Sequence, residues 1–127
     1  MHTIRIFFLF VMGIIMQHNY AAAQQLDRTL LIFGKEAAPG TVEQQLLLFQ
    51  KDTAGMKERD LKIQVIDTGN SLIKKYKVLE NQFTVLLLGK DGGEKLRTLQ
   101  LLSTANLFSI IDAMPMRRQE MRKNHQP

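Results

Sequence analysis

The sequence predicts an α/β domain with a four-stranded mixed sheet of order 2-1-3-4 and helices on both faces. Two continuous apolar runs, Arg28–Phe33 and Phe83–Leu88, have the pattern of central strands that are covered on both sides. Two runs in which apolar and polar residues alternate, Leu61–Val65 and Glu94–Leu101, have the pattern of half-covered edge strands. Segments with helical spacing connect these runs.

The segment after the first strand is expected to turn and then enter a helix. Residues 34–40 contain two glycines and a proline, and Thr41 with Gln44 three residues later forms a capping-box pattern. The helix is expected to end near Gly55. Its apolar face is predicted from residues at helical spacing, namely Val42, Leu46 and Phe49.

Two further helices are expected in the second half of the chain. Ser71 is predicted to cap a short helix after the second strand, and Ser103 a longer one after the fourth strand. Between them, Lys90–Gly93 supplies a hairpin turn, because glycine adopts the positive φ angles that tight turns need. Pro115 is expected to end or kink the last helix at Met114.

The order of elements, β-α-β-α-β-β-α, determines the predicted topology. A right-handed crossover places the second strand beside the first and parallel to it. The short hairpin makes the fourth strand antiparallel to the third. The resulting order, 2-1-3-4 with helices on both faces, is the core of the thioredoxin fold.

The first 23 residues have the features of a secretory signal peptide. Arg5 precedes an apolar stretch of 11 residues, Ile6–Met16, and Ala21-Ala22-Ala23 provides the small side chains that signal peptidase requires. The apolar stretch is shorter than the roughly 20 residues that span a bilayer. We therefore expect cleavage after Ala23 and export to the periplasm or beyond the cell, with no membrane span left in the mature protein.

Residues 24–127 are expected to form a single domain, because no repeat or linker divides them. The whole chain has a formal net charge of +5 at pH 7, and residues 115–127 form a basic C-terminal segment. Such a segment can bind phosphates or anionic lipid, or it can be a solvated helix end. Export argues against DNA as a partner.

The composition excludes several kinds of chemistry. The chain has no cysteine, so it can form no disulfide and supply no catalytic thiol. The only histidine after the predicted signal peptide is His125, the third residue from the end, and no serine lies in a Gly-x-Ser-x-Gly context. Carboxylates are too sparse for a calcium loop. We expect no catalytic residue, no cofactor and no metal site.

Three stretches carry a resemblance to a known family. They are Glu58-Arg-Asp-Leu61, Leu88-Gly-Lys-Asp-Gly-Gly-Glu-Lys-Leu-Arg97 and Ile111-Asp-Ala-Met-Pro-Met-Arg-Arg-Gln-Glu-Met121. Through them the chain resembles domain of unknown function 4174 from about Arg28 to Met121. The resemblance implies a thioredoxin-like or peroxiredoxin-like domain that lacks cysteines.

The redox enzymes of this fold differ from the present chain at two places. They carry a reactive cysteine after the first strand, where residues 34–41 of this chain have none. They also carry a cis-proline before the third strand, whereas residues 76–83 contain no proline. The resemblance therefore implies the scaffold of a redox enzyme without its nucleophile or its substrate groove.

Charged residues near the hairpin and the last helix form the candidate site. One interpretation is a structural network in which Asp112 and Glu120 hold Arg97 and Arg117. The other is an open arginine cluster that grips an anionic ligand, because guanidinium groups match carboxylate and phosphate geometry. The members are Lys90, Asp91, Lys95, Arg97, Asp112, Arg117, Arg118 and Glu120.

The leading functional hypothesis is a non-catalytic thioredoxin-like module of the cell envelope that binds a protein or an anionic glycan or lipid. One alternative is an antioxidant enzyme, related to peroxiredoxins, that acts with a partner thiol. Another is a basic binder of polyanions that uses Arg117, Arg118 and Arg122.

Overall fold

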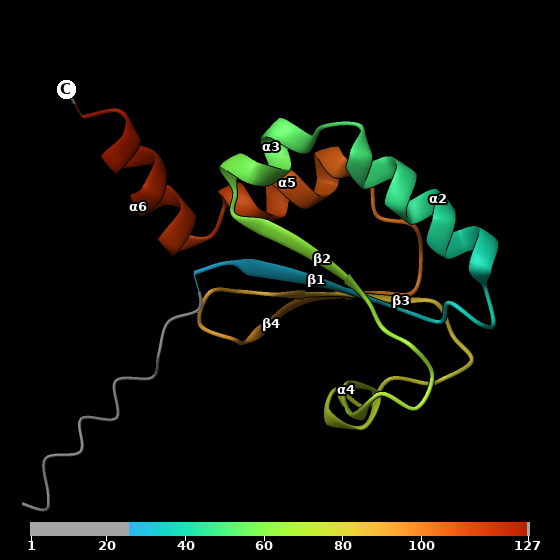
Figure 1. Cartoon of the computed structure of the whole chain (residues 1–127). Coiled ribbons are helices and arrows are strands. Elements are labelled where there is room, and N and C mark those ends of the chain that lie inside the picture. The colour runs from blue at the N-terminus through green and yellow to red at the C-terminus, as the bar shows by residue number, and fades with distance from the viewer. Residues whose placement is uncertain (1–25, 127) are drawn as a thin grey trace, which may run out of the picture.

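The computed structural model describes residues 26–126, and its strands form one four-stranded sheet (Figure 1). The sheet order is β2-β1-β3-β4. β1 is parallel to β2 and antiparallel to β3, and β4 is antiparallel to β3. The predicted order and strand directions are therefore confirmed, whereas the predicted signal peptide lies outside the described residues. The strands are β1 (Arg28–Phe33), β2 (Leu61–Val65), β3 (Thr84–Leu88) and β4 (Glu94–Thr98).

Helices cover both faces of this sheet, as predicted. On one face lie α2 (Pro39–Gln50), α3 (Thr53–Glu58) and α5 (Thr104–Asp112), and on the other lies the short α4 (Ser71–Lys75) (Figure 1). The two central strands are buried along almost their whole length, and β2 and β4 are partly exposed. Each face has its own apolar core, because side chains of successive strand residues point to opposite faces.

The first helical segment differs from the sequence prediction. α2 begins at Pro39, two residues before Thr41, and the residue before it, Ala38, makes no side-chain capping bond. Proline suits this position because its fixed φ matches the helix and its missing N–H would have no partner there. The capping-box prediction at Thr41 is therefore wrong.

The predicted long helix is in fact two helices. α2 ends at Gln50, and α3 begins at Thr53 with a cap from Asp52, whose Oδ1 accepts a 2.8 Å bond from the Gly55 N–H. Gly55 is thus inside a helix rather than at its end. A Cβ on Gly55 would lie 2.5 Å from the Phe108 ring, so this glycine allows α3 to pack closely on α5.

Two other capping predictions have different outcomes. The cap of α4 is Asn70 rather than Ser71, because Asn70 Oδ1 accepts the Leu72 N–H at 2.9 Å. The cap of α5 is Ser103, as predicted, and its hydroxyl oxygen accepts the Asn106 N–H. Asparagine and serine cap helices about equally well, so the sequence does not favour either Asn70 or Ser71 as the capping residue of α4.

A fifth helix of the described residues, α6 (Pro115–Asn124), was not predicted as a separate element. Met114 adopts an extended conformation, with ψ of 139°, as the residue before a proline prefers. Pro115 therefore ends the previous helix and also begins the next one. In the described part of the chain, no helix has both the length and the apolar character needed to cross a membrane.

Candidate functional site

Eight charged side chains form a connected network at the end of the sheet where β1 begins. Each member makes at least one ion pair of 4.0 Å or less with another member. We call this set the ionic lattice. It joins β1, the end of α3, the β3–β4 turn, α5 and α6. Its cations are Arg28, Arg59, Lys90 and Arg117, and its carboxylates are Glu58, Asp60, Asp112 and Glu120.

Glu120 of α6 is bound by cations from two other parts of the fold. Arg28 donates to both of its oxygens, at 3.2 and 3.1 Å, and Lys90 of the hairpin turn lies 2.7 Å from Oε1. Lys90 also pairs with Asp60 at 2.7 Å. These bonds fasten α6 to the start of β1 and to the hairpin.

Asp112, at the end of α5, has a similar role. Arg59 binds both of its oxygens, at 2.9 and 2.7 Å, and the same guanidinium lies 3.9 Å from the centre of the Phe108 ring. Arg117 also reaches Asp112, at 3.3 Å, and donates to the carbonyl and the carboxylate of Glu58. The ends of α3, α5 and α6 are thereby linked.

The charges of the ionic lattice balance, with four cations against four carboxylates. Burial acts against charge on Glu120, but bonds from Lys90 and Arg28 outweigh it and lower the pKa of this carboxyl. The bond from Arg59 lowers the pKa of Asp112. Every lattice cation has a carboxylate partner, so the arrangement favours a structural network over an open anion site.

The predicted site residues are only partly brought together. Lys90, Asp112, Arg117 and Glu120 belong to the ionic lattice, and Arg117 is only 1% exposed. Arg97 lies elsewhere, because it pairs with Glu94 at 2.7 Å and donates to backbone carbonyls at the end of α4. The pairing of Arg97 with Asp112 or Glu120, which the sequence suggested, is therefore not found.

The remaining three predicted residues lie outside the ionic lattice. Asp91 and Lys95 form their own pair across the hairpin turn at 2.7 Å, and Asp91 also accepts the Gly93 N–H, as turn aspartates do. Arg118 is exposed on α6 and has no ion pair with any described residue. It lines a shallow surface pocket with Met121, Arg122 and His125.

Four lattice residues were missed as site residues. Three of them, Glu58, Arg59 and Asp60, are the Glu58–Leu61 stretch that carries part of the family resemblance. The fourth, Arg28, was visible only as the charged start of an apolar strand. The signal that could have found them was the occurrence of charged residues at the start of β1 and directly before β2, because the starts of these two strands are adjacent in a parallel pair.

The region that carries the thiol in redox enzymes of this fold lies at the other end of β1. Because β1 is six residues long, the two ends are about 20 Å apart. Gly34, with φ of 92°, packs directly on the backbone of Gln82 and Phe83. The described residues contain no cis peptide bond. Residues 34–41 contain no cysteine and residues 76–83 no proline.

A small cavity of about 290 Å³ adjoins the ionic lattice at the hairpin. It is lined by Arg28, Lys90 and Lys95, and by Met114, Pro115 and Met116 at the start of α6. The Nε of Arg28 is buried and, among the described residues, has no hydrogen-bond partner. The cavity thus brings the predicted hairpin residues together with the methionine-bearing segment.

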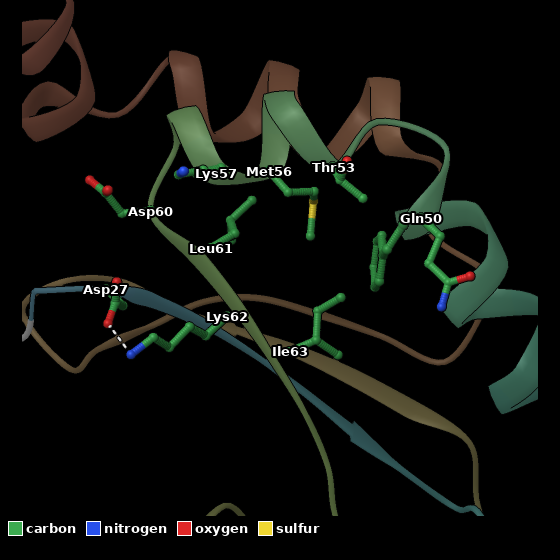
Figure 2. Close-up of a pocket in the computed structure, with 10 residues that line it drawn as sticks. Asp27, Gln50, Thr53, Met56, Lys57, Asp60, Leu61, Lys62 and Ile63 are labelled. Atoms are coloured by element: carbon green, nitrogen blue, oxygen red, sulfur yellow. Dashed lines mark ion pairs between the residues drawn. The ribbon is translucent and has the colours of Figure 1, made fainter.

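A larger groove, of about 480 Å³, runs between helices α2 and α3 and the edge strand β2 (Figure 2). Its floor is apolar and comes from Phe49, Met56, Leu61 and Ile63. Ile63 is 38% exposed, although it lies in the middle of a strand. Polar side chains surround this floor, among them Asp27, Gln50, Thr53, Lys57, Asp60 and Lys62 (Figure 2).

The backbone along this groove is open for further pairing. β2 is at the edge of the sheet and, among the described strands, pairs with β1 alone. At one end of their ladder the Arg28 N–H donates to the Asp60 carbonyl, and at the other end the Ile66 N–H donates to the Ile32 carbonyl. In a parallel pair, every second residue of a strand points its backbone N–H and C=O to the neighbouring strand. The backbone groups of the even-numbered residues from 60 to 66 therefore face β1. The groups that face away from β1 belong to Leu61, Ile63 and Val65.

None of these places has the ligands of a metal site. Within residues 26–126, no three histidine, cysteine or carboxylate side chains gather in a way that could hold an ion. The lattice carboxylates are instead occupied by arginine and lysine.

Comparison with known proteins supports the fold. The family model described as domain of unknown function (DUF4174) matches residues 66–120, in agreement with the resemblance of the sequence. A crystal structure of reduced Plasmodium vivax 2-Cys peroxiredoxin is similar, with a TM-score of 0.55 and 16% identity over 76% of this chain and 80% of that chain. No curated protein sequence matches. The chain thus has a thioredoxin-like fold without cysteine.

Proposed function

We propose that this protein is an exported, non-catalytic thioredoxin-like module that binds an extended polypeptide segment along β2. The observation that carries the proposal is the open edge of β2 beside an apolar groove. A strand added there gains backbone hydrogen bonds, and its alternate side chains enter the groove, which is the usual form of recognition by strand addition. Because the chain contains no cysteine, it can supply no catalytic thiol, and we therefore propose binding rather than thiol catalysis.

The groove is more suitable for this role than the predicted anion site. The ionic lattice is electrically neutral and its arginines are already bound, so an anion would have to displace a carboxylate. By contrast, the outward backbone groups of β2 have no partner among the described residues. The groove floor is apolar, and among the residues that line the groove only Asp27, Asp60 and Lys62 belong to ion pairs.

Selection of peptides from a displayed random library on the purified protein tests the proposal. We expect enriched peptides of alternating apolar residues, whose binding is weakened by Ile63→Lys because the new charge enters the groove. The matched control is Leu79→Lys, which adds the same charge at a 68% exposed leucine after α4. Equal binding by both variants, or no enrichment at all, would contradict the proposal.

Export is the second part of the proposal, and it rests on residues 1–23. Expression of the full chain in a bacterial host should give a mature protein in the envelope fraction that begins at Gln24. Ala23→Phe should prevent processing, because the bulky ring does not fit the peptidase pocket. A cytoplasmic protein with an intact N-terminus would refute export.

A second candidate function is the binding of anionic glycan or lipid through α6. Arg118, Arg122 and Lys123 are exposed and make no ion pair with a described carboxylate. On a polyanion column, the protein should be retained at low salt and released as salt rises. Charge reversal at Arg118 and Arg122 should abolish retention, whereas a column profile unchanged by this double variant would exclude α6 as the site.

A further inference from the structure

We propose that the strand which adds to β2 is β2 of a second copy, so that two molecules join their sheets edge to edge around Ile63. This inference rests on the proposed function and names the partner for the same groove. The symmetric arrangement is an antiparallel pair of β2 strands related by a two-fold axis. It unites two four-stranded sheets into one continuous sheet.

The register follows from the backbone groups that face away from β1. In an antiparallel pair, two residues that stand directly opposite can exchange both of their hydrogen bonds. With the two-fold axis at Ile63, this residue stands opposite Ile63 of the other copy, and Leu61 stands opposite Val65 of the other copy. All three outward-facing residues of β2 are then hydrogen-bonded in both copies. An axis at Leu61 or Val65 would leave part of the strand without a partner.

The side chains fit the same register. On the groove face, Ile63 meets its own copy and Leu61 meets Val65, so every cross-strand pair is apolar. On the opposite face, Lys62 meets Gln64, so no like charges are opposed. A one-residue shift would place the apolar side chains opposite polar ones.

Charge around the groove also permits an identical partner. Two lysines and two aspartates line it, namely Lys57, Lys62, Asp27 and Asp60, so the face has no net charge. Lys62 is already held by Asp27 at 2.7 Å. A lysine on an edge strand usually hinders pairing, but here Lys62 is paired with Asp27 and would stand opposite Gln64 of the other copy rather than a second lysine. Association of two such faces therefore meets no net repulsion, and the exposed part of Ile63 becomes covered.

Amide hydrogen exchange of the purified wild-type protein, measured over a wide range of concentration, tests this arrangement residue by residue. In dilute protein, the amides of Leu61, Ile63 and Val65 should exchange fast, because nothing accepts their hydrogens. In concentrated protein they should become protected. The amides of Lys62 and Gln64 serve the β1 ladder and should be protected at every concentration. Outward amides that stay fast in a protein shown to be dimeric would overturn the proposed interface.

Sedimentation of variants supplies the second test. Ile63→Pro removes only an N–H that faces away from β1, so the ladder with β1 is kept and the dimer should be lost. Ile63→Lys opposes two like charges at the axis and should raise the dissociation constant by about tenfold or more. Leu79→Lys should leave it unchanged. Circular dichroism checks that each variant is folded, and dimerisation that survives both Ile63 variants would refute the interface.

The two proposals can fail separately. If the wild-type protein is a monomer at every concentration, the second copy is refuted as the partner. Peptides selected by the library experiment would still bind β2 in that case, and the proposed function would stand. If neither dimer nor peptide binding involves Ile63, both proposals are wrong.

Discussion

Arg28, the first residue of β1, and Glu120, in the last helix, form a two-bond ion pair although 92 positions separate them. The arginine is 1% exposed and uses its two terminal nitrogens, donating also to the Arg59 carbonyl. The pair therefore connects the first and last elements of the described fold. Its place at the centre of the ionic lattice makes it the first target for mutation.

Glu120→Gln should destabilise the protein. The substitution keeps the size of the side chain but leaves Arg28 and Lys90 without their shared carboxylate. Loss of one partner of a buried ion pair costs about 3–5 kcal/mol, and the 24% exposure of Glu120 should reduce the loss to about 2–3 kcal/mol. Urea unfolding measures it. Glu80→Gln, at an exposed site without an ion pair, should change the free energy of unfolding by less than about 0.5 kcal/mol.

Neighbouring arginines of α6 should behave differently. Arg117→Ala removes a buried guanidinium that binds Glu58 and Asp112, and we expect a loss of about 2–4 kcal/mol. Arg118→Ala removes an exposed side chain and should leave stability nearly unchanged. Thermal unfolding of the two variants compares them. Equal effects would show that the ionic lattice does not fasten α6.

Stability should fall in acid. The pKa values of Asp112 and Glu120 are lowered in the folded state, so each carboxylate binds fewer protons there than in the unfolded chain. Their contribution is complete above the unfolded pKa, near 4, and is lost as pH falls through the lower folded values. The free energy of unfolding, measured from about pH 7 to about pH 2, should therefore decrease in that acid range. Asp112→Asn should reduce the dependence.

Two glycines in helices should respond oppositely to alanine. A Cβ at Gly55 would lie 2.5 Å from both the Phe108 ring and an oxygen of Asp52, so Gly55→Ala should destabilise by about 1–3 kcal/mol. At Gly40, in the first turn of α2, nothing lies within 4 Å of the added carbon. Gly40→Ala should stabilise by about 0.5 kcal/mol. Chemical denaturation of the two variants measures the change in the free energy of unfolding that each substitution causes.

Local patterns were sufficient for the sheet but not for the helix boundaries. Continuous and alternating apolar runs depend on burial, so they gave the four strands and their order, although β4 ends at Thr98 rather than at the predicted Leu101. The start of α2 at Pro39 and the cap at Asn70 depend on choices between equivalent neighbours, which differ by little energy. Helix α6 was missed because most of its residues are polar or charged, and because its one buried residue is Arg117, which is held by ion pairs.

By itself the sequence determined the chemistry that is excluded and the sheet that is built. A chain without cysteine has no thiol, and the pattern of apolar residues in a strand reflects which of its side chains are buried. Only the tertiary structure decided the partners of the charges: Arg97 pairs with Glu94, whereas Arg28 and Arg59 bind the carboxylates of α6 and α5. It alone also revealed the groove beside β2. The ion pairs of Arg28 and Arg59 depend on distances between segments remote in sequence, and no local pattern encodes those distances.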